Sequence, residues 1–373
     1  MNVAPDASLA GLTGSQAREE RIAAARRALQ ETGVADASLP AWIGASWRRC
    51  LGRGQRPDTP VHFDLVTRSR MRAVRERSTA LMQAAVPVIA GMRQAMQSTG
   101  YFAILTDRDG VVVAVDGPID RRDRRADVIA RVGVDLSEDA VGTTAIGAAL
   151  AEQVPVWLHR GEHFFAANGV YSCAGAPIYD ARGELTGMLD LTGVCTVERP
   201  GLRHLVAAAA HAIETRSVLA VPHALSIALY WPGLVGAATG VGWLAVDSEG
   251  GVRAFNRVAR EMLAIDPEAG LPHLSNLFAM QWQRLFDLAD GESIRQLPLW
   301  SGLVVSASVQ RAGSEVTLTA MRGDGARPLR ELETALIRRT VSELRGNVKA
   351  AAAQLGISRA TIYRKLGRRS LSV

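Results

Sequence analysis

The sequence predicts a multidomain protein with an α+β domain, a second and smaller α+β domain, and an all-α helix-turn-helix at its C-terminal end. The chain has 373 residues, which is more than one ordinary hydrophobic core accommodates. Apolar residues change from helical spacing to strand-like runs and back twice before residue 320. The final segment then holds two short helical patterns separated by Gly356.

Residues 1–66 are predicted to form an N-terminal helical region, and residues 67–219 are predicted to form the first α+β domain. The expected elements are, in order, helices over Ala17–Glu31, Pro40–Leu51 and Thr67–Ser98, strands over Tyr101–Leu105, Val111–Val115, Val154–Leu158, Tyr171–Ile178 and Leu185–Leu191, and a helix over Gly201–Leu219. Two β-rich runs around the Asp-Gly turn at residues 107–110 predict a hairpin.

Residues 223–321 repeat this pattern on a smaller scale and are predicted to form the second α+β domain. The expected elements are strands over Gly242–Asp247 and Val252–Phe255, a helix over Arg257–Leu263, and strands over Leu303–Val309 and Glu315–Ala320. Asn256 directly precedes the helix, where its side chain can accept hydrogen bonds from the first helical turn.

Residues 322–373 are predicted to form the helix-turn-helix domain. From Arg322 to the end there are twelve Lys and Arg against four Asp and Glu, whereas the preceding 321 residues carry a net charge of −2. A basic end on a nearly neutral chain is typical of a nucleic-acid-binding domain. Leu329–Leu344 carries an apolar helical stripe, and a merely solvated charged helix does not account for the two capped helices that follow.

The last helix is predicted to enter the DNA major groove. Ile362 and Leu366 are expected to point inward, which leaves one basic face open. The helix caps and the side chains on or beside that face are Asn347, Ser358, Arg359, Thr361, Tyr363, Arg364, Lys365 and Arg368. Arginine can donate two hydrogen bonds to guanine, but phosphate contacts usually outnumber base contacts, so the sequence does not assign the base-reading residue.

Residue usage excludes several other classes of protein. The sequence contains only two lysines, Lys349 and Lys365, so residues 1–320 cannot supply the lysine of a P-loop, a kinase site or a Schiff base. No apolar run reaches about 18 residues, and the N-terminal residues lack the order of a secretory signal. Cys50, Cys173 and Cys195 do not make a disulfide framework and fit a reducing cytoplasm.

Polar residues within the first α+β domain indicate a small-molecule pocket. Glu162, His163, Cys173 and Asp190 lie among aromatic and aliphatic neighbours, as the polar groups of such pockets do. An alternative interpretation is that Glu162 and His163 only satisfy buried backbone groups.

Two further alternatives concern metal and redox chemistry. A metal site could draw on His159, His163, Cys173 and Cys195, although no short ligand-pair spacing supports it. A redox role for Cys173 is the other alternative, although a buried cysteine is usually inert.

The C-terminal segment Leu329–Arg369 resembles the Fis-type DNA-binding domain found at the C-terminus of bacterial enhancer-binding regulators. The resemblance implies a homodimer that binds inverted-repeat double-stranded DNA.

A second resemblance, to AcoR-like (acetoin-catabolism-type) regulators and their GAF sensor domain, covers residues 42–195. The similar blocks are Ser46–Cys50, Gly133–Glu138, Val141–Gly147, Glu162–Phe164, Cys173–Ile178 and Gly187–Gly193. The resemblance implies a GAF-like sensor whose effector-binding residues are Thr143, Thr144, Glu162, His163, Phe164, Cys173 and Asp190. The family usually has Asn where this chain has Thr144, which implies a different effector preference if that side chain touches the effector.

Residues 223–320 resemble a PAS domain, mainly over Ala245–Gly250 and Ala254–Ala259. Because distinctive haem or flavin ligands are missing, dimerisation is the expected role of this PAS-like domain. Full-length AcoR-like regulators carry an AAA+ ATPase between sensor and DNA-binding domain. Here only Met321–Leu329 joins those parts, and the sigma-contact sequence Gly-Ala-Phe-Thr-Gly-Ala is absent.

These patterns predict a cytoplasmic, homodimeric transcriptional regulator that binds double-stranded DNA and senses a small-molecule effector. It is expected to need no cofactor or metal, to be no enzyme, and neither to hydrolyse ATP nor to activate sigma-54 polymerase. Direct contact with another form of RNA polymerase, or with a partner, is expected instead. The alternatives are a GAF-fold cysteine-dependent redox enzyme or sensor, and a sensor-independent architectural DNA-binding protein.

Overall fold

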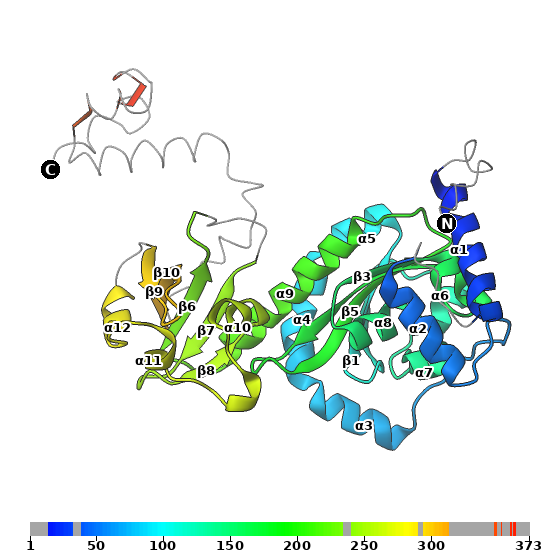
Figure 1. The fold of residues 1–373 in the computed structure, drawn as a ribbon, viewed down its shortest axis with the longest axis horizontal. Helices are drawn as coiled ribbons and strands as arrows, with labels where there is room; N and C mark the ends of the chain where they lie inside the picture. Colours follow the sequence, from blue (N-terminus) through cyan, green and yellow to red (C-terminus); the bar gives the residue numbers. More distant parts are fainter. Residues whose placement is uncertain are drawn as a thin grey trace, which may run out of the picture. The chain divides into compact units, whose positions relative to one another are not determined.

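A computed structural model describes residues 14–32, 39–233, 240–289 and 294–312, together with residues 347, 348, 352, 359, 361 and 362. The chain divides into two compact units, Met1–Ser314 and Glu315–Val373. The first unit contains two antiparallel sheets of five strands each, here called the first sheet and the second sheet (Figure 1). The prediction of mixed α and β structure is therefore confirmed. Within the described residues, no helix combines the length and apolar character needed to cross a membrane.

The first sheet has the strand order β2-β1-β5-β4-β3, and all neighbouring strands are antiparallel. Its strands are β1 (Phe102–Asp107), β2 (Val112–Asp116), β3 (Val156–His159), β4 (Tyr171–Tyr179) and β5 (Leu185–Val194). The helices that accompany it are α1 (Gly14–Thr32), α2 (Ala41–Gly52), α3 (Arg68–Arg77), α4 (Thr79–Gly91), α5 (Arg93–Thr99), α6 (Arg124–Ile129), α7 (Glu138–Val141), α8 (Ala145–Glu152), η2 (Arg160–Glu162), η3 (Ala166–Val170) and α9 (Leu202–Ala220). All five expected strands and the hairpin of β1 and β2 are confirmed.

Side chains alternate between the two faces of the first sheet, and each face has its own apolar core. On β5, Leu189 and Leu191 pack with α4 and α9, whereas Met188 packs with α6 and α8 on the opposite face. The sheet is thus covered on both faces, as Figure 1 shows for α4 and α9 on one side and α8 on the other. The candidate site lies on the face toward α6 and α8.

The long helix expected over Thr67–Ser98 is wrong, because this segment forms three helices, α3, α4 and α5. The helices are interrupted at Ser78 (φ −92°, ψ 3°) and at Met92 (φ −87°, ψ −5°), where ψ lies near 0°. Apolar side chains on both sides of each break enter the same core, so their spacing stays nearly helical throughout. The pattern therefore does not reveal the breaks.

Three short helices near the site, α6, α7 and α8, were not expected from the sequence. Each begins after a polar residue whose side chain accepts a backbone N–H of the first turn: Asp123, Ser137 and Thr144. The helices have between four and eight residues, which is too short for a periodic apolar pattern to mark them.

The second sheet has the strand order β8-β7-β6-β10-β9. Its elements are β6 (Leu225–Tyr230), β7 (Gly242–Val246), β8 (Val252–Phe255), α10 (Arg257–Leu263), η4 (Pro267–Ala269), α11 (Leu274–Leu277), α12 (Arg284–Leu288), β9 (Arg295–Pro298) and β10 (Val304–Arg311). The helix capped by Asn256 is confirmed, whereas β6 and β9 were missed. The strand expected over Glu315–Ala320 lies outside the described residues.

Candidate functional site

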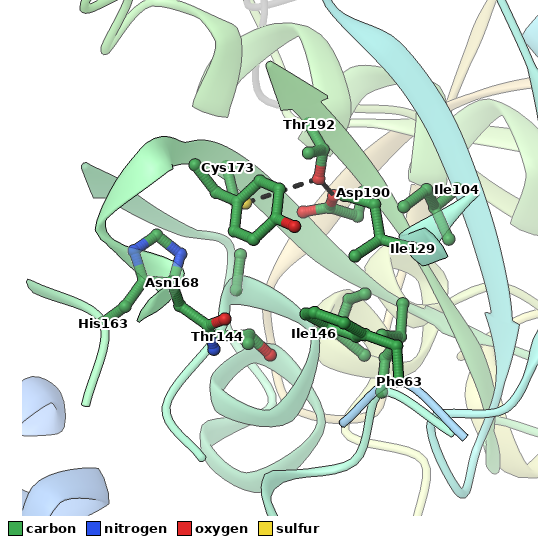
Figure 2. Close-up of a pocket in the computed structure, with 13 residues that line it drawn as sticks. Phe63, Ile104, Ile129, Thr144, Ile146, His163, Asn168, Cys173, Asp190 and Thr192 are labelled. Carbon is green, nitrogen blue, oxygen red and sulfur yellow. Dashed lines mark hydrogen bonds between the residues drawn. The ribbon is translucent and has the colours of Figure 1, made fainter. Parts of the chain in front are cut away.

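A buried cavity lies between the first sheet and the helices α6 and α8 (Figure 2). The cavity has a volume of about 30 Å³, measured as the space open to the centre of a water-sized sphere. Its apolar lining residues are Phe63, Ile104, Ile129, Leu136, Ala145 and Ile146. Its polar lining residues are Thr144, His163, Asn168, Tyr171, Cys173, Asp190 and Thr192. A mostly apolar wall with a few convergent polar groups is the usual construction of a small-molecule site.

Two hydrogen-bond acceptors on one side of the cavity have no partner among the described residues: His163 Nε2 and Asn168 Oδ1. His163 Nδ1 lies 2.9 Å from the Arg160 carbonyl and donates to it, which leaves a lone pair on Nε2. Asn168 Nδ2 donates to the Val141 carbonyl at 3.0 Å, so its Oδ1 is the free atom. Burial lowers the pKa of His163 to about 4, so the ring is neutral at pH 7.

Asp190, Thr192 and Cys173 form a hydrogen-bonded chain across the cavity from His163 (Figure 2). The Thr192 hydroxyl donates to Asp190 Oδ2 and lies 3.3 Å from Cys173 Sγ, whereas Asp190 Oδ1 has no partner among the described residues. Burial raises the pKa of Asp190 to about 7, although the Thr192 hydroxyl opposes this shift. When Asp190 is protonated and Thr192 donates to Oδ2, the proton lies on Oδ1 and can be donated into the cavity.

The cavity brings together four of the seven side chains predicted to bind an effector. These are Thr144, His163, Cys173 and Asp190. The other three, Thr143, Glu162 and Phe164, do not line the cavity. Effector binding by the four remains a prediction.

Thr143, Glu162 and Phe164 contact the N-terminal helices instead. The Thr143 hydroxyl lies 2.7 Å from Ser46 Oγ, and Phe164 packs in a core that α1 and α2 supply. Glu162 accepts hydrogen bonds from the His159 backbone N–H at 2.8 Å and from Arg18 at 2.6 Å. The alternative interpretation, a side chain that satisfies buried backbone, therefore describes Glu162.

The Ser46–Cys50 block attaches α2 to α7 through the buried carboxylate of Glu138. That carboxylate accepts hydrogen bonds from Ser46 at 2.6 Å, from Arg49 at 2.7 and 2.9 Å, and from Arg53 at 2.9 Å. Burial opposes ionisation, but the bonds from Arg49, Ser46 and Arg53 outweigh it and lower the pKa of Glu138. This part of the AcoR-like pattern therefore joins the N-terminal helices to the sheet.

The loop that carries His163 is held from outside by α1 and α2. Trp47 Nε1 donates to the Glu162 carbonyl at 2.9 Å. Arg26 donates to the Gly161 carbonyl at 2.9 Å and also to the His163 carbonyl. The loop that carries His163 therefore contacts both N-terminal helices.

The described residues contain no group of three or more His, Cys, Asp or Glu placed to hold a metal ion. Cys195 is exposed, with its Sγ 3.2 Å from Arg125, whereas Cys173 is buried on the cavity face. Burial and the nearby Asp190 raise the pKa of Cys173 well above its usual range. Cys173 is thus a protonated thiol, which is a poor nucleophile and a weak candidate for redox chemistry.

The described residues of the second unit fit the expected helix-turn-helix. Ala352 and Ile362 are buried, whereas Arg359 is exposed, as an inward apolar face and an open basic face require. Asn347 is also exposed, and Thr361 is half-buried. The other predicted DNA-contacting residues, Ser358, Tyr363, Arg364, Lys365 and Arg368, lie outside the described residues. DNA contact by any of these side chains remains a prediction.

Four cavity residues of chemical interest were missed by the sequence reasoning: Phe63, Asn168, Tyr171 and Thr192. Thr192 could have been found, because side chains two apart on β5 share a face and Asp190 was already a candidate. No local pattern marks Asn168, which lies in the short turn η3 and reaches the cavity only through the fold.

Comparison with known proteins matches residues 13–215 to the family described as "MimR, N-terminal domain" and residues 328–368 to "Bacterial regulatory protein, Fis family". The first match covers more than half of the chain. The chain belongs to the MimR N-terminal domain family. The second match confirms the Fis-type helix-turn-helix predicted at the C-terminal end.

The chain is similar to curated transcriptional regulators. It is 26% identical over 253 residues to the "Signal-transduction and transcriptional-control protein" of Clostridium beijerinckii, which covers 67% of this chain and 40% of that protein. It is 27% identical over 189 residues to the "Acetoin dehydrogenase operon transcriptional activator AcoR" of Bacillus subtilis (strain 168), covering 51% and 31%. The chain thus spans less than half the length of these relatives. The resemblance to AcoR-like regulators is confirmed.

Among solved structures, the chain is similar to the "Crystal Structure of the E.coli DhaR(N)-DhaL complex", with 13% identity and a TM-score of 0.44 over 72% of this chain and 99% of that chain. Between the two family matches lie residues 216–327, which contain the second sheet and no lysine. This interval therefore lacks a P-loop.

Proposed function

We propose that this chain is a DNA-binding transcriptional regulator. Its affinity for DNA is controlled by a small hydroxyl-bearing effector that binds in the cavity of the first sheet. The Fis-family match, the basic C-terminal end and the regulator relatives support the DNA-binding part. One observation carries the effector part. Three polar atoms that have no partner in the described part of the chain, on His163, Asn168 and Asp190, surround one buried and mostly apolar space.

The chemistry of these atoms selects the effector class. A buried polar atom without a partner costs about 1–3 kcal/mol, which a ligand recovers by supplying the missing hydrogen bond. His163 Nε2 and Asn168 Oδ1 accept, so they require a hydrogen-bond donor on the ligand, which a hydroxyl group supplies. Asp190 in its protonated form donates to a ligand oxygen. Because no arginine or lysine is among the described lining residues, the part of the effector inside the cavity is uncharged.

A short carbon skeleton with a hydroxyl group and a second oxygen satisfies these demands. The apolar walls of Ile104, Ile129 and Ile146 suit its carbons. Acetoin is a first test compound, because it has a hydroxyl and a carbonyl on four carbons and an acetoin operon appears in the name of one relative. The small free volume favours compounds of this size over drug-sized ligands.

We also propose how the DNA-binding end operates. The chain acts in the cytoplasm as a homodimer on two half-sites, with the side chains of Arg359 and its helix neighbours in the major groove. Its two α+β parts, residues 67–219 and 223–321, serve as a GAF-like sensor and a PAS-like pairing domain. Since the only lysines are Lys349 and Lys365, it works without P-loop ATP hydrolysis, by blocking DNA or by direct contact with RNA polymerase.

The test needs an operator and matched cavity variants. DNA that co-purifies with the full chain is sequenced, and the affinity for the enriched sequence is measured by fluorescence anisotropy with and without acetoin, 2,3-butanediol and related hydroxyl compounds. We expect at least one compound to change operator affinity threefold or more. The change should be absent in Asn168→Ala and Asp190→Ala and retained in Arg122→Gln, an exposed control outside the cavity. Equal affinities across the whole panel would contradict the proposal.

A further inference from the structure

A wider groove adjoins the cavity on the other side of Phe63 and Tyr171. Both side chains line the cavity and also the groove. The groove has a volume of about 400 Å³, measured as the space open to the centre of a water-sized sphere. Their rings meet edge to face, with centroids 6.3 Å apart and planes at 89°. This pair of rings is therefore the partition between the buried space and the outer groove.

Three arginines line the groove, and two of them are attached to the partition. The Tyr171 hydroxyl donates to the Arg125 carbonyl at 3.0 Å. Arg131 donates to the Phe63 carbonyl at 3.1 Å. The third arginine, Arg124, is exposed at the start of α6. The backbone of Arg125 thus anchors the Tyr171 ring, and the Arg131 side chain anchors the Phe63 backbone.

The positive charge of the groove is only partly neutralised. Arg125 forms an ion pair with Asp123 at 2.8 Å. Arg131 donates to carbonyl oxygens, which leave its charge in place, and the described residues record no partner for the Arg124 side chain. One carboxylate, on the exposed Asp64, also lines the groove. Arg124 and Arg131 therefore remain available for an anion.

We propose that the groove is an anion subsite adjoining the cavity across the Phe63–Tyr171 pair, and that the effector is a small hydroxy carboxylate. This inference rests on the proposed function. The uncharged, hydroxyl-bearing end lies behind Phe63 and Tyr171, against His163, Asn168 and Asp190. The carboxylate stays in the groove, held by Arg124 and Arg131. The reverse orientation is unfavourable, because a carboxylate in the cavity meets Asp190 and no cation.

The test compares two matched series of probes on the full chain. One series consists of unbranched ω-hydroxycarboxylates of three to six carbons, and the other consists of the α,ω-diols of equal length. Dissociation constants are measured by isothermal titration calorimetry at 0.05 M and 0.5 M salt. We expect at least one hydroxycarboxylate to bind roughly tenfold more tightly than its matched diol at low salt, with the advantage reduced at high salt.

Variants of the groove arginines test whether the carboxylate of the probe binds in the groove. Arg124→Gln should weaken binding of that hydroxycarboxylate roughly 3- to 10-fold while it changes diol affinity less than twofold. Arg122→Gln should change neither, because Arg122 is exposed nearby but outside the groove. Arg131→Lys, which keeps the charge beside Phe63, should retain most of the advantage.

The outcomes separate this inference from the proposed function. If diols bind, lose affinity in Asn168→Ala, and match or exceed the hydroxycarboxylates, the anion subsite is refuted while the cavity proposal stands. An advantage for the carboxylate that persists in Arg124→Gln and at high salt also refutes the subsite. If neither series binds at any length, both proposals fail for this effector class.

Discussion

The two sheets share the same local construction at one edge but differ in how they use buried polar side chains. In each edge hairpin an aspartate, Asp107 or Asp247, accepts the backbone N–H groups two and four residues later at 2.8–3.1 Å. In each sheet the hairpin lies at one edge, and its inner strand, β1 or β7, pairs with one of the three remaining strands, β5 or β6. The frameworks are therefore similar, and the functional difference lies in the buried side chains.

Two buried asparagines show the difference. In the second sheet, Asn256 uses its whole amide: Oδ1 accepts from the backbone N–H groups of Trp243 and Ala259, both at 2.9 Å, and Nδ2 donates to the Val241 carbonyl at 2.8 Å. Beside the first sheet, Asn168 uses only Nδ2 among the described residues. A satisfied amide stabilises the fold, whereas an unsatisfied acceptor in a cavity is available to a ligand.

Asn256→Ala should give the largest loss of stability. It removes a helix cap and leaves buried backbone groups unpaired, so we expect a cost of about 2–4 kcal/mol. Asn168→Ala removes one hydrogen bond and should cost about 1 kcal/mol, yet it should abolish the response to the effector. Urea unfolding followed by circular dichroism gives the stabilities, and operator anisotropy gives the response.

The opposite ranking of the two stability losses would contradict the different roles assigned to Asn256 and Asn168. If Asn168→Ala destabilises the chain more than Asn256→Ala, then Asn168 is a structural residue and its free Oδ1 has no role in ligand binding. If Asn256→Ala abolishes the effector response at temperatures where the variant is folded, the second sheet takes part in sensing.

The matched pair Asp107→Ala and Asp247→Ala should show a smaller difference. Both variants lose the turn hydrogen bonds, but Asp107 is also buried against Arg77, with which it forms an ion pair. We expect costs of about 2–3 kcal/mol for Asp107→Ala and about 1–2 kcal/mol for Asp247→Ala, because only the former also removes one of the two carboxylates, Asp107 and Asp109, that pair with Arg77. Equal costs, measured by the same unfolding assay, would show that the Arg77 pair contributes nothing.

The structural features that were predicted correctly from the sequence depend on residues that are close together in the chain. The cap at Asn256 follows from its place directly before α10, and the β1–β2 hairpin follows from its Asp-Gly turn. Asp190 and Cys173 were candidates because they stand in blocks similar to a known family, and both line the cavity.

The features that it missed depend on partners far apart in the chain. Thr143 faces Ser46, and Glu162 faces Arg18, so their direction depends on where α1 and α2 dock. Likewise Arg131 contacts the Phe63 carbonyl, 68 residues earlier in the chain, only because the fold brings the two segments together. Neither spacing nor composition encodes these contacts, which explains why three predicted effector residues lie outside the cavity.

The pH dependence of stability tests whether Asp190 is neutral in the folded chain. Burial raises its pKa from 3.8 to about 7, so between these values the folded chain holds a proton that the unfolded chain has released. Stability is therefore lost as pH rises from about 4 to 7. Asp190→Asn removes this loss and should be more stable than the wild type by up to about 4 kcal/mol at pH 8, with no gain at pH 4.

The stability of Asp190→Asn is compared with that of the wild type at each pH because other buried groups also titrate. The pKa of His163 falls from 6.5 to about 4, so its contribution is lost as pH falls through that range, in the opposite sense to Asp190. Burial raises the pKa of Glu214 to about 7, which adds to the Asp190 effect. Both groups cancel in the difference between the two chains. A difference that does not vary with pH would mean that Asp190 is ionised throughout.

Trp47→Phe should have the smallest effect, and it tests how the cavity communicates with the N-terminal helices. The substitution keeps an aromatic ring but removes the donor to the Glu162 carbonyl, one residue before His163. One such hydrogen bond contributes about 0.5–1.5 kcal/mol, so the effector-induced change in operator affinity should shrink roughly 2- to 5-fold while effector affinity changes little. Trp157→Phe is the matched control, because Trp157 Nε1 has no acceptor among the described residues. If both variants respond to the effector like the wild type, the contact of α2 with the His163 loop is structural and the signal leaves the cavity by another route.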